Sequence, residues 1–208
     1  MHSWPQFVWC LEKRGIYLGR PPTIPAQEDP SGTYYGIPAI GFYVDNRLSL
    51  GNDESQVRGT WLTLLAHVFP PAEGYGLNAE ASAGQEGQLD IEVAEVIFHG
   101  RREEHIFFVV ECKNPQYENS RSSWNGAKLQ LADYLKGICE AKNLGPGAQK
   151  FGAVSIGKSV QFMTYTYGGN GRNQVSHILE PVHEGVLRLD RQYRTVQRWL
   201  DYIKANSS

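Results

Sequence analysis

An aspartate, a glutamate and a lysine lie at the ends of two strand-like runs in the middle of the chain. Asp90 stands near the start of the run 87–98, and Glu111 and Lys113 stand at the end of the run 105–113. Residues i and i+2 of a strand share a face, so Glu111 and Lys113 should point to one side and Cys112 to the other. Carboxylate oxygens are the ligands that Mg²⁺ prefers, and a bound Mg²⁺ or Mn²⁺ suits phosphodiester hydrolysis. The pattern therefore predicts a divalent-metal site for phosphodiester chemistry.

A helix-like run at 124–138 adds two polar side chains to this group. Gln130 and Tyr134 are four residues apart and should project together from the helix. We expect Gln130 to hydrogen-bond the lysine, a metal-bound water or a phosphate, with Tyr134 supporting it. Lys113 would orient or deprotonate the attacking water and stabilise the developing negative charge. The backbone carbonyl of Cys112 is a further candidate metal ligand, and Glu92, on the strand face of Asp90, is a spare one.

These segments together resemble a known family. The stretches GQLD, VVECKNP and LQLADYL are similar to the PD-(D/E)XK phosphodiesterase superfamily, and more narrowly to RecB-type nuclease domains. The RecB-type pattern is Gly-x-x-Asp, then Asp/Glu-x-Lys, then a helical Gln-x-x-x-Tyr, and this chain matches it at Gly87, Asp90, Glu111, Lys113, Gln130 and Tyr134. Leu89 replaces the proline before the first acid, and the second acid is a glutamate.

The resemblance implies a metal-dependent nuclease that hydrolyses DNA, or less favourably RNA, with Mg²⁺ or Mn²⁺. Asp90, Glu111, Lys113 and Gln130 would be its catalytic residues, with Tyr134 in support. The family often carries a glutamate on the helix before its first core strand, and Glu54 occupies that place. The implied metal ligands are therefore Glu54, Asp90, Glu111 and the Cys112 carbonyl.

The remaining elements follow from periodicity and turn chemistry. A helix is expected after Asn52 or Asp53 and up to Pro70, with Val57, Trp61, Leu64, Leu65 and Val68 on one apolar stripe. We expect a hairpin or two short strands at 33–50 with Asp45-Asn46 as the turn, and a flexible connector at 70–87. Two strands at 151–157 and 159–167, a strand at 175–182 and a C-terminal helix at 191–205 complete the expected order.

This order predicts an α/β protein, a single domain with a central mixed β-sheet flanked by helices and a restriction-endonuclease-like αβββαβ core. The domain would span residues 1–208, with residues 1–50 as an N-terminal extension and the core from about 52 to 167.

Charge and cysteine content narrow the class of protein. The net charge is −2, from 20 Lys+Arg against 22 Asp+Glu. That balance argues against non-specific coating of duplex DNA, whose affinity comes from phosphate neutralisation. The three cysteines, Cys10, Cys112 and Cys139, form no CxxC pair, so neither a zinc site nor a disulfide framework is indicated.

Nothing in the chain reads as a membrane span or a signal peptide. No apolar run approaches the ~20 residues that a membrane helix needs, and the first residues lack a basic n-region. We therefore expect a soluble protein in the nucleus or cytoplasm, with a nucleic acid as its partner. The oligomeric state is left open.

Two alternatives belong to other classes. A nuclease-like fold with weak or no catalysis could serve as a module that binds nucleic acid or protein. An unrelated thiol hydrolase could use Cys112 with a histidine.

Overall fold

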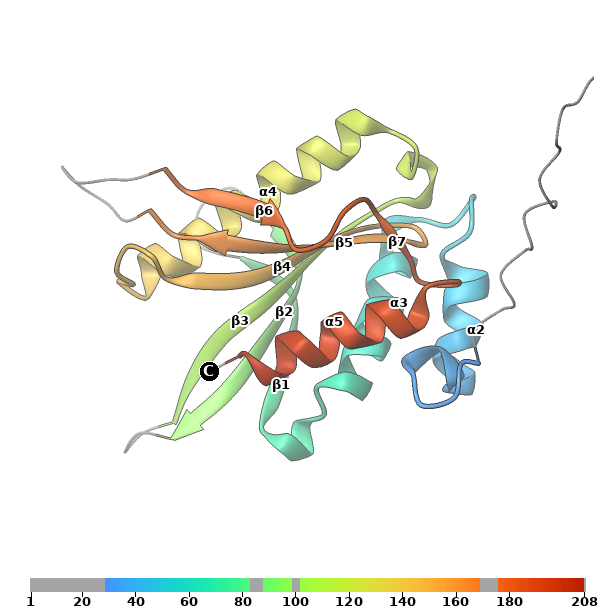
Figure 1. Cartoon of the computed structure of the whole chain (residues 1–208), viewed down its shortest axis with the longest axis horizontal. Helices are drawn as coiled ribbons and strands as arrows, with labels where there is room; N and C mark the ends of the chain where they lie inside the picture. Colours follow the sequence, from blue (N-terminus) through green and yellow to red (C-terminus); the bar gives the residue numbers. More distant parts are fainter. Residues whose placement is uncertain (1–28, 83–87, 99–101, 169–175, 208) are drawn as a thin grey trace, which may run out of the picture.

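The computed structural model describes residues 29–82, 88–98, 102–168 and 176–207. These residues form an α/β architecture with one mixed, open sheet and helices packed on it (Figure 1). Gly87 of the nuclease-like pattern and Cys10 lie outside the described residues. Among the described residues, no helix is long and apolar enough to cross a membrane.

The described sheet has seven strands in the order β1-β2-β3-β4-β5-β6, with β7 also paired to β5. Their bounds are β1 Tyr75–Ser82, β2 Gln88–Phe98, β3 Arg102–Lys113, β4 Gln149–Ile156, β5 Ser159–Thr166, β6 Ile178–Pro181 and β7 Leu187–Arg188. Every pairing is antiparallel except that of β3 with β4, which is parallel. The last residues of β3 and β4 therefore lie at the same edge of the sheet.

The described helices are α2 Pro38–Arg47, α3 Glu54–Val68, α4 Arg121–Ala141 and α5 Tyr193–Ala205, with short 3-10 turns at Tyr34–Gly36, Pro71–Glu73 and Pro115–Tyr117. The expected helix after Asp53 is confirmed as α3. The Asp53 side chain caps it by accepting a hydrogen bond from the backbone N–H of Gln56. Its whole predicted apolar stripe is buried. The helices at 124–138 and 191–205 are also confirmed, and α4 extends further at both ends than its periodicity indicated.

The expected hairpin at 33–50 is wrong, because Pro38–Arg47 is helical. Pro38 occupies the first turn, where its missing N–H costs nothing. Ile40 and Val44, one turn apart, are buried in the same core as α3. Asp45-Asn46 lies inside the helix, where the Asn46 side chain donates a hydrogen bond to the backbone carbonyl of Phe42.

The expected flexible connector at 70–87 is wrong over the part of it that the structure describes. Residues 75–82 form β1, which pairs with β2 along its length. The glycine and alanine content of this segment disfavours a strand locally. Pairing with the long strand β2 supplies the backbone hydrogen bonds that outweigh this preference.

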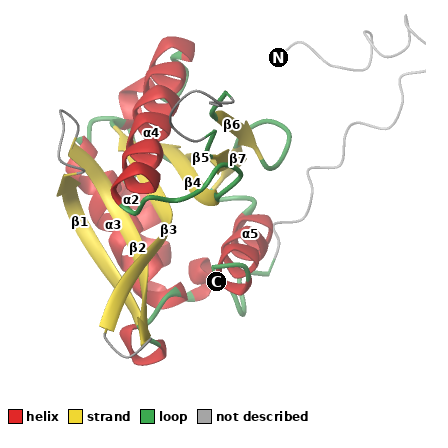
Figure 2. Cartoon of the chain, turned by 90° about the vertical axis from the view of Figure 1, so that its left-hand side faces the viewer, coloured by secondary structure: helices red, strands yellow, loops and turns green. Residues whose placement is uncertain are grey.

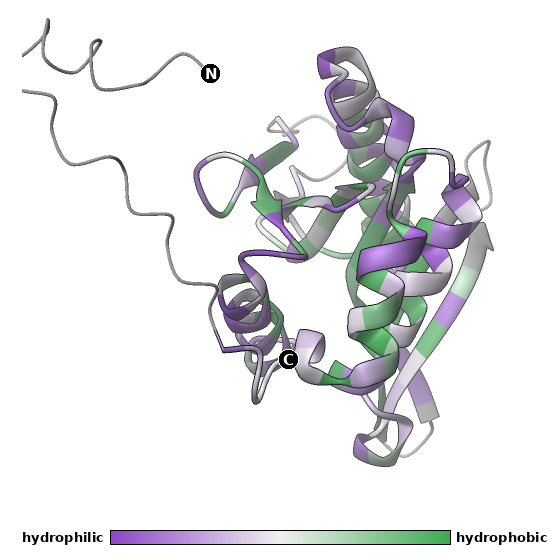
Figure 3. Cartoon of the chain, turned by 90° about the vertical axis from the view of Figure 1, so that its right-hand side faces the viewer, coloured by the Kyte–Doolittle hydropathy of each residue, from purple (hydrophilic) through white to green (hydrophobic). Residues whose placement is uncertain are grey.

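The two faces of the sheet carry separate hydrophobic cores. Helices α2, α3 and α5 cover one face, where Ile91, Val93, Val110 and Cys112 are buried. Helix α4 covers the other face, over Val109, Val154 and Ile156. Figures 1 and 2 show α4 on the opposite side of the strands from α3. In Figure 3 the hydrophobic residues gather where helices meet strands, and hydrophilic residues colour the outer sides of the helices.

Candidate active site

The alternation along β2 and β3 places Asp90, Glu111 and Lys113 on the α4 face. In the antiparallel register Ile91 is opposite Val110, and both belong to the other face. Asp90 precedes Ile91 and Glu111 follows Val110, so both acid side chains point to the α4 side. The backbone N–H of Cys112 donates to Asp90 Oδ2 at 2.7 Å. Both carboxyl groups are nearly buried, with Asp90 5% and Glu111 2% exposed.

Lys113 contacts two acids, Glu111 on its own strand and Glu54 on α3. Its Nζ lies 2.6 Å from Glu111 Oε1 and 3.9 Å from Glu54 Oε1. Glu54 is the first residue of α3, and this end of the helix reaches the edge where β3 ends. The structure thus brings together Glu54, Asp90, Glu111 and Lys113, four of the residues that the sequence pattern singled out.

Arg58 is a fifth charged residue at this place, and the sequence pattern did not single it out. We call Glu54, Arg58, Asp90, Glu111 and Lys113 the acid cluster. Arg58 NH1 lies 3.1 Å from Asp90 Oδ1. Arg58 follows Glu54 by four residues, so both project from the same side of α3. The i, i+4 spacing of Glu54 and Arg58 is the feature of the sequence that indicates this arginine.

Burial dominates the electrostatics of the acid cluster. It raises the pKa of Glu111 to about 7, even though the Lys113 ammonium opposes the shift. Burial also raises the pKa of Asp90, against the Cys112 N–H, Lys113 and Arg58. The pKa of Glu54 is raised in the same way, with the Asp90 charge adding to the effect. Three acids with raised pKa values at one point are typical of a site where burial serves chemistry.

Lys113 keeps its proton. Burial lowers its pKa, but the hydrogen bond and charge of Glu111, with Glu54 and Asp90, outweigh burial, so its pKa is raised. A protonated lysine can donate hydrogen bonds and stabilise negative charge, but it cannot accept a proton. Of the roles expected for Lys113, charge stabilisation and orientation fit this state.

The two predicted residues of α4 differ in their surroundings. Tyr134 is buried, and its hydroxyl donates to Glu92 Oε1, whose other oxygen accepts from Asn78 Nδ2 at 3.3 Å. Tyr134 therefore supports the site through Glu92, which lies two residues beyond Asp90 on the same strand face. Gln130 is exposed on α4, and among the described residues no hydrogen bond or ion pair connects it to the acids. Its role as a catalytic residue stays a prediction.

The fit of the acid cluster to a divalent cation depends on its donor set. Two nearly buried carboxylates beside a lysine are suitable oxygen ligands for Mg²⁺ or Mn²⁺. Within the described ranges, however, no three histidine, cysteine, aspartate or glutamate side chains are grouped closely enough to hold a metal ion. Asp90 and Glu111 instead each contact a cationic side chain. The ligand set of Glu54, Asp90, Glu111 and the Cys112 carbonyl remains a prediction.

Cys112 points away from these charges. Its side chain is fully buried in the core beneath α3, and burial raises the pKa of its thiol far above the usual value. A nucleophilic cysteine needs a thiolate and access to substrate. This environment argues against the thiol-hydrolase alternative.

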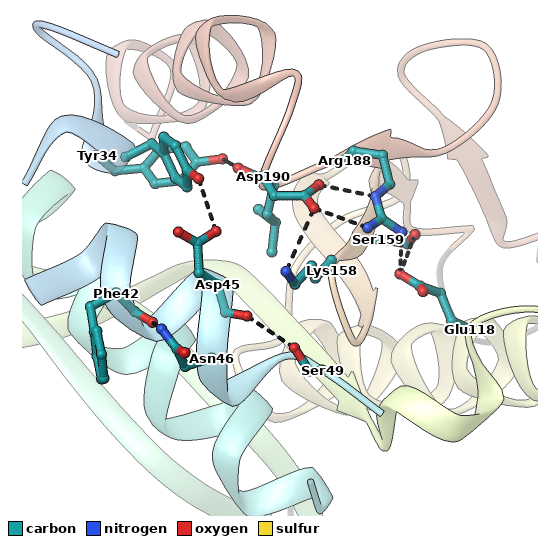
Figure 4. A network of polar contacts seen from close by, with 12 residues as sticks. Tyr34, Phe42, Asp45, Asn46, Ser49, Glu118, Lys158, Ser159, Arg188 and Asp190 are labelled. Carbon is teal, nitrogen blue, oxygen red and sulfur yellow. Dashed lines mark hydrogen bonds and ion pairs between the residues drawn. The ribbon is translucent and has the colours of Figure 1, made fainter. Parts of the chain in front are cut away.

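A second charged cluster, which we call the Arg188 network, joins segments that are distant in sequence (Figure 4). Arg188 contacts Glu118 at 2.8 Å and both carboxylate oxygens of Asp190 at 3.1 Å. Glu118 also accepts a hydrogen bond from the Ser159 hydroxyl at 2.7 Å, and Lys158 lies 3.7 Å from Asp190. The network connects the residues after β3 and the β4–β5 turn to the start of α5.

An open cavity of about 680 Å³ lies on α5, away from the acid cluster. Its lining residues are Thr164, Val182, Thr195, Arg198, Trp199 and Tyr202. Thr164 is opposite Phe151 on the strand face that α5 covers, near the start of β4. None of the predicted site residues lines it, so it is not the pocket of the acid cluster.

Comparison with known proteins adds no relative. No protein-family model, no curated protein and no solved structure matches this chain.

Proposed function

We propose that this chain is a metal-dependent phosphodiesterase of the PD-(D/E)XK type, a nuclease that acts on DNA in preference to RNA. The observation that carries the proposal is the convergence of Glu54, Asp90, Glu111 and Lys113. These residues are 59 positions apart at most in the chain, and they come from three elements. Lys113 contacts Glu111 and Glu54, and the charges of Asp90 and Glu54 both act on Glu111.

The order of elements supports the proposal. α3, β1, β2, β3, α4 and β4 follow one another in the chain, with β1 to β3 antiparallel and β4 parallel to β3. The resemblance implies an αβββαβ order, and this succession of elements is consistent with it. Asp90, Glu111 and Lys113 lie where the parallel strands β3 and β4 end and β2 begins, next to Glu54 at the start of α3.

The acids and the lysine of the cluster have different chemical tasks in this proposal. Bound Mg²⁺ or Mn²⁺ would supply Lewis-acid stabilisation of the phosphoryl oxygens and a more acidic water. Asp90 and Glu111 would hold the cation, and Glu54 would be the third carboxylate beside it. Lys113, protonated and held by Glu111, would donate a hydrogen bond to the attacking water or to the phosphate, where negative charge develops. The Tyr134–Glu92 contact would keep α4 in place over the strands.

Cleavage assays test the proposal directly. The purified chain is incubated with labelled single-stranded DNA, duplex DNA and RNA in Mn²⁺ or in EDTA. We expect Mn²⁺-dependent cleavage of at least one DNA substrate, lost in EDTA and lost in Lys113→Ala. Lys136→Ala is the matched control, because Lys136 is also a lysine paired with a glutamate but lies on the outer part of α4. Cleavage that persists in EDTA or in Lys113→Ala would refute the mechanism.

A specific observation also favours the binding-module alternative. Asp90 and Glu111 are each paired with a protein cation, and three acids do not gather as a metal site among the described residues. A module of this kind would bind nucleic acid without cleaving it, whichever divalent metal ion is present. Calorimetry separates the two, since a nuclease site should bind Mn²⁺ with a Kd of tens of micromolar or tighter, about −6 kcal/mol, and lose it in Asp90→Ala.

A further inference from the structure

Both carboxylate oxygens of Asp90 already have a hydrogen-bond donor. Oδ2 accepts from the backbone N–H of Cys112 at 2.7 Å, and that donor is part of the strand. Oδ1 is 3.1 Å from Arg58 NH1. The two donors differ in one respect, because a backbone N–H cannot leave, whereas a long arginine side chain can turn away. A cation bound at Asp90 Oδ1 would lie beside the Arg58 guanidinium, so the two positive charges would compete for this oxygen.

The net charge of the acid cluster indicates how cation binding and phosphodiester binding affect each other. With the three carboxylates ionised, as binding of a metal ion requires, Glu54, Asp90 and Glu111 stand against Arg58 and Lys113, which leaves one negative charge. A divalent cation would turn this to one positive charge. A phosphodiester carries one negative charge, so a cluster that holds both the cation and the diester is neutral. Binding of cation and substrate should therefore be coupled.

Arg58 is placed to take part in that coupling. Its side chain is about a quarter exposed, with 24% accessible surface against 7% for Asp90. It therefore reaches solvent at the mouth of the cluster while one nitrogen contacts the buried acid. A guanidinium offers donors in a fork that matches a phosphate group. Once displaced from Asp90, it would lie beside any phosphodiester that approaches the acids.

We propose that Arg58 is an exchangeable counter-ion and a phosphate-binding residue. In the resting site it neutralises Asp90; when a divalent cation binds Asp90, its guanidinium transfers to a non-bridging oxygen of the bound phosphodiester. This inference rests on the proposed function and adds a residue that the nuclease-like motifs do not include. It predicts that removing Arg58 moves metal affinity and nucleic-acid affinity in opposite directions.

Calorimetry with Mn²⁺ alone and fluorescence anisotropy with a single-stranded oligodeoxynucleotide in Ca²⁺ measure the two affinities. For Arg58→Gln we expect Mn²⁺ to bind about tenfold more tightly, because a charge-assisted hydrogen bond no longer competes. We expect the oligonucleotide to bind about tenfold more weakly. Arg198→Gln is the matched control, because Arg198 is an exposed arginine on α5, and it should change neither affinity by more than about twofold.

Arg58→Lys keeps the charge and removes the fork, and it serves if Arg58→Gln does not fold. It should tighten Mn²⁺ binding less than the glutamine variant and still weaken oligonucleotide binding. Unchanged or weaker Mn²⁺ binding in the folded Arg58 variants would overturn the inference while leaving the nuclease proposal intact. Absence of Asp90-dependent Mn²⁺ binding in the unaltered chain would remove both.

Discussion

The acid cluster and the Arg188 network contain the same kinds of side chain but differ in the balance between burial and pairing. In the network, burial raises the pKa of Asp190, but Arg188 and Lys158 outweigh it, and the pKa is lowered. In the acid cluster, burial outweighs the partners, and the pKa values of Asp90 and Glu111 are raised. Salt bridges that hold a fold favour the ionised acid. Acids kept against their preferred state are more typical of functional sites.

The geometry explains this difference. Asp190 receives two parallel hydrogen bonds from one guanidinium and a further charge from Lys158, on a surface where water still reaches the groups. Glu111 has one contact with Lys113 and is almost completely buried. Removing an ion pair should therefore cost stability in the network and function in the acid cluster.

The largest expected difference is in cleavage. Glu111→Gln and Glu118→Gln make the same isosteric change in the two clusters, and each original carboxylate contacts one basic side chain. We expect Glu111→Gln to lower the cleavage rate by roughly a hundredfold to a thousandfold, because it removes a proposed metal ligand and the partner of Lys113. Glu118→Gln should stay within about twofold. Initial cleavage rates in Mn²⁺ measure both variants. Equal losses of rate would contradict the assignment of function to the acid cluster and of stability to the Arg188 network.

The next largest effect is the pH dependence of stability from Glu111. An unfolded glutamate loses its proton near 4.5, whereas the native state holds it up to about pH 7. The native state therefore binds more protons in this window, and the free energy of unfolding falls as pH rises from about 4.5 to 7. The contribution is on the order of 3 kcal/mol.

Glu111→Gln should remove this pH dependence and leave the variant relatively more stable above pH 7. Urea unfolding of both proteins between pH 5 and pH 8, without metal, measures the difference. A difference in stability that does not change with pH would contradict the burial-dominated pKa of Glu111.

A smaller effect of opposite sign is expected from the network. Arg188→Ala leaves Glu118 and Asp190 without their main partner, and we expect it to cost about 1–2 kcal/mol, a value kept low because the arginine is one-third exposed. Asp190 has a lowered pKa, so its contribution is present above the ordinary pKa of 3.8 and is lost as pH falls through its native value. The cost of Arg188→Ala should therefore shrink in acid. Chemical denaturation at pH 7 and pH 3 tests this.

The smallest expected effect concerns Tyr134. Tyr134→Phe removes the hydroxyl that donates to the buried Glu92 and should cost about 1 kcal/mol. Asn78 still contacts the other oxygen of Glu92, so the carboxylate keeps one partner. Thermal unfolding measures the change. A cleavage loss as large as that of Glu111→Gln would instead place Tyr134 among the residues that act on the substrate.

Local pattern was sufficient for most of the elements and for the orientation of the acids. The apolar stripe and the Asp53 cap identified α3, because a helix is specified by periodicity and by its end groups. The i, i+2 rule placed Glu111 and Lys113 opposite Cys112, and the buried Cys112 confirms it. These features need no knowledge of distant residues.

Other features were settled by contacts between distant segments. The segment 75–82 is a strand because β2 offers it a partner, and the segment 38–47 is a helix because Ile40 and Val44 pack on the core beside α3. Neither partner is visible within a short window of sequence, so local propensity gave the wrong result in both segments.

By itself, the sequence determined which side chains carry charge and which strand face they occupy, because alternation along a strand is a local property. Only the tertiary structure decided how these charges are balanced. It paired Arg58 with Asp90, joined Tyr134 to Glu92, and enclosed Glu111 until its pKa rose to about 7. The physical reason is that burial and pairing are sums over neighbours from separate elements, and those sums exist only once the chain has folded.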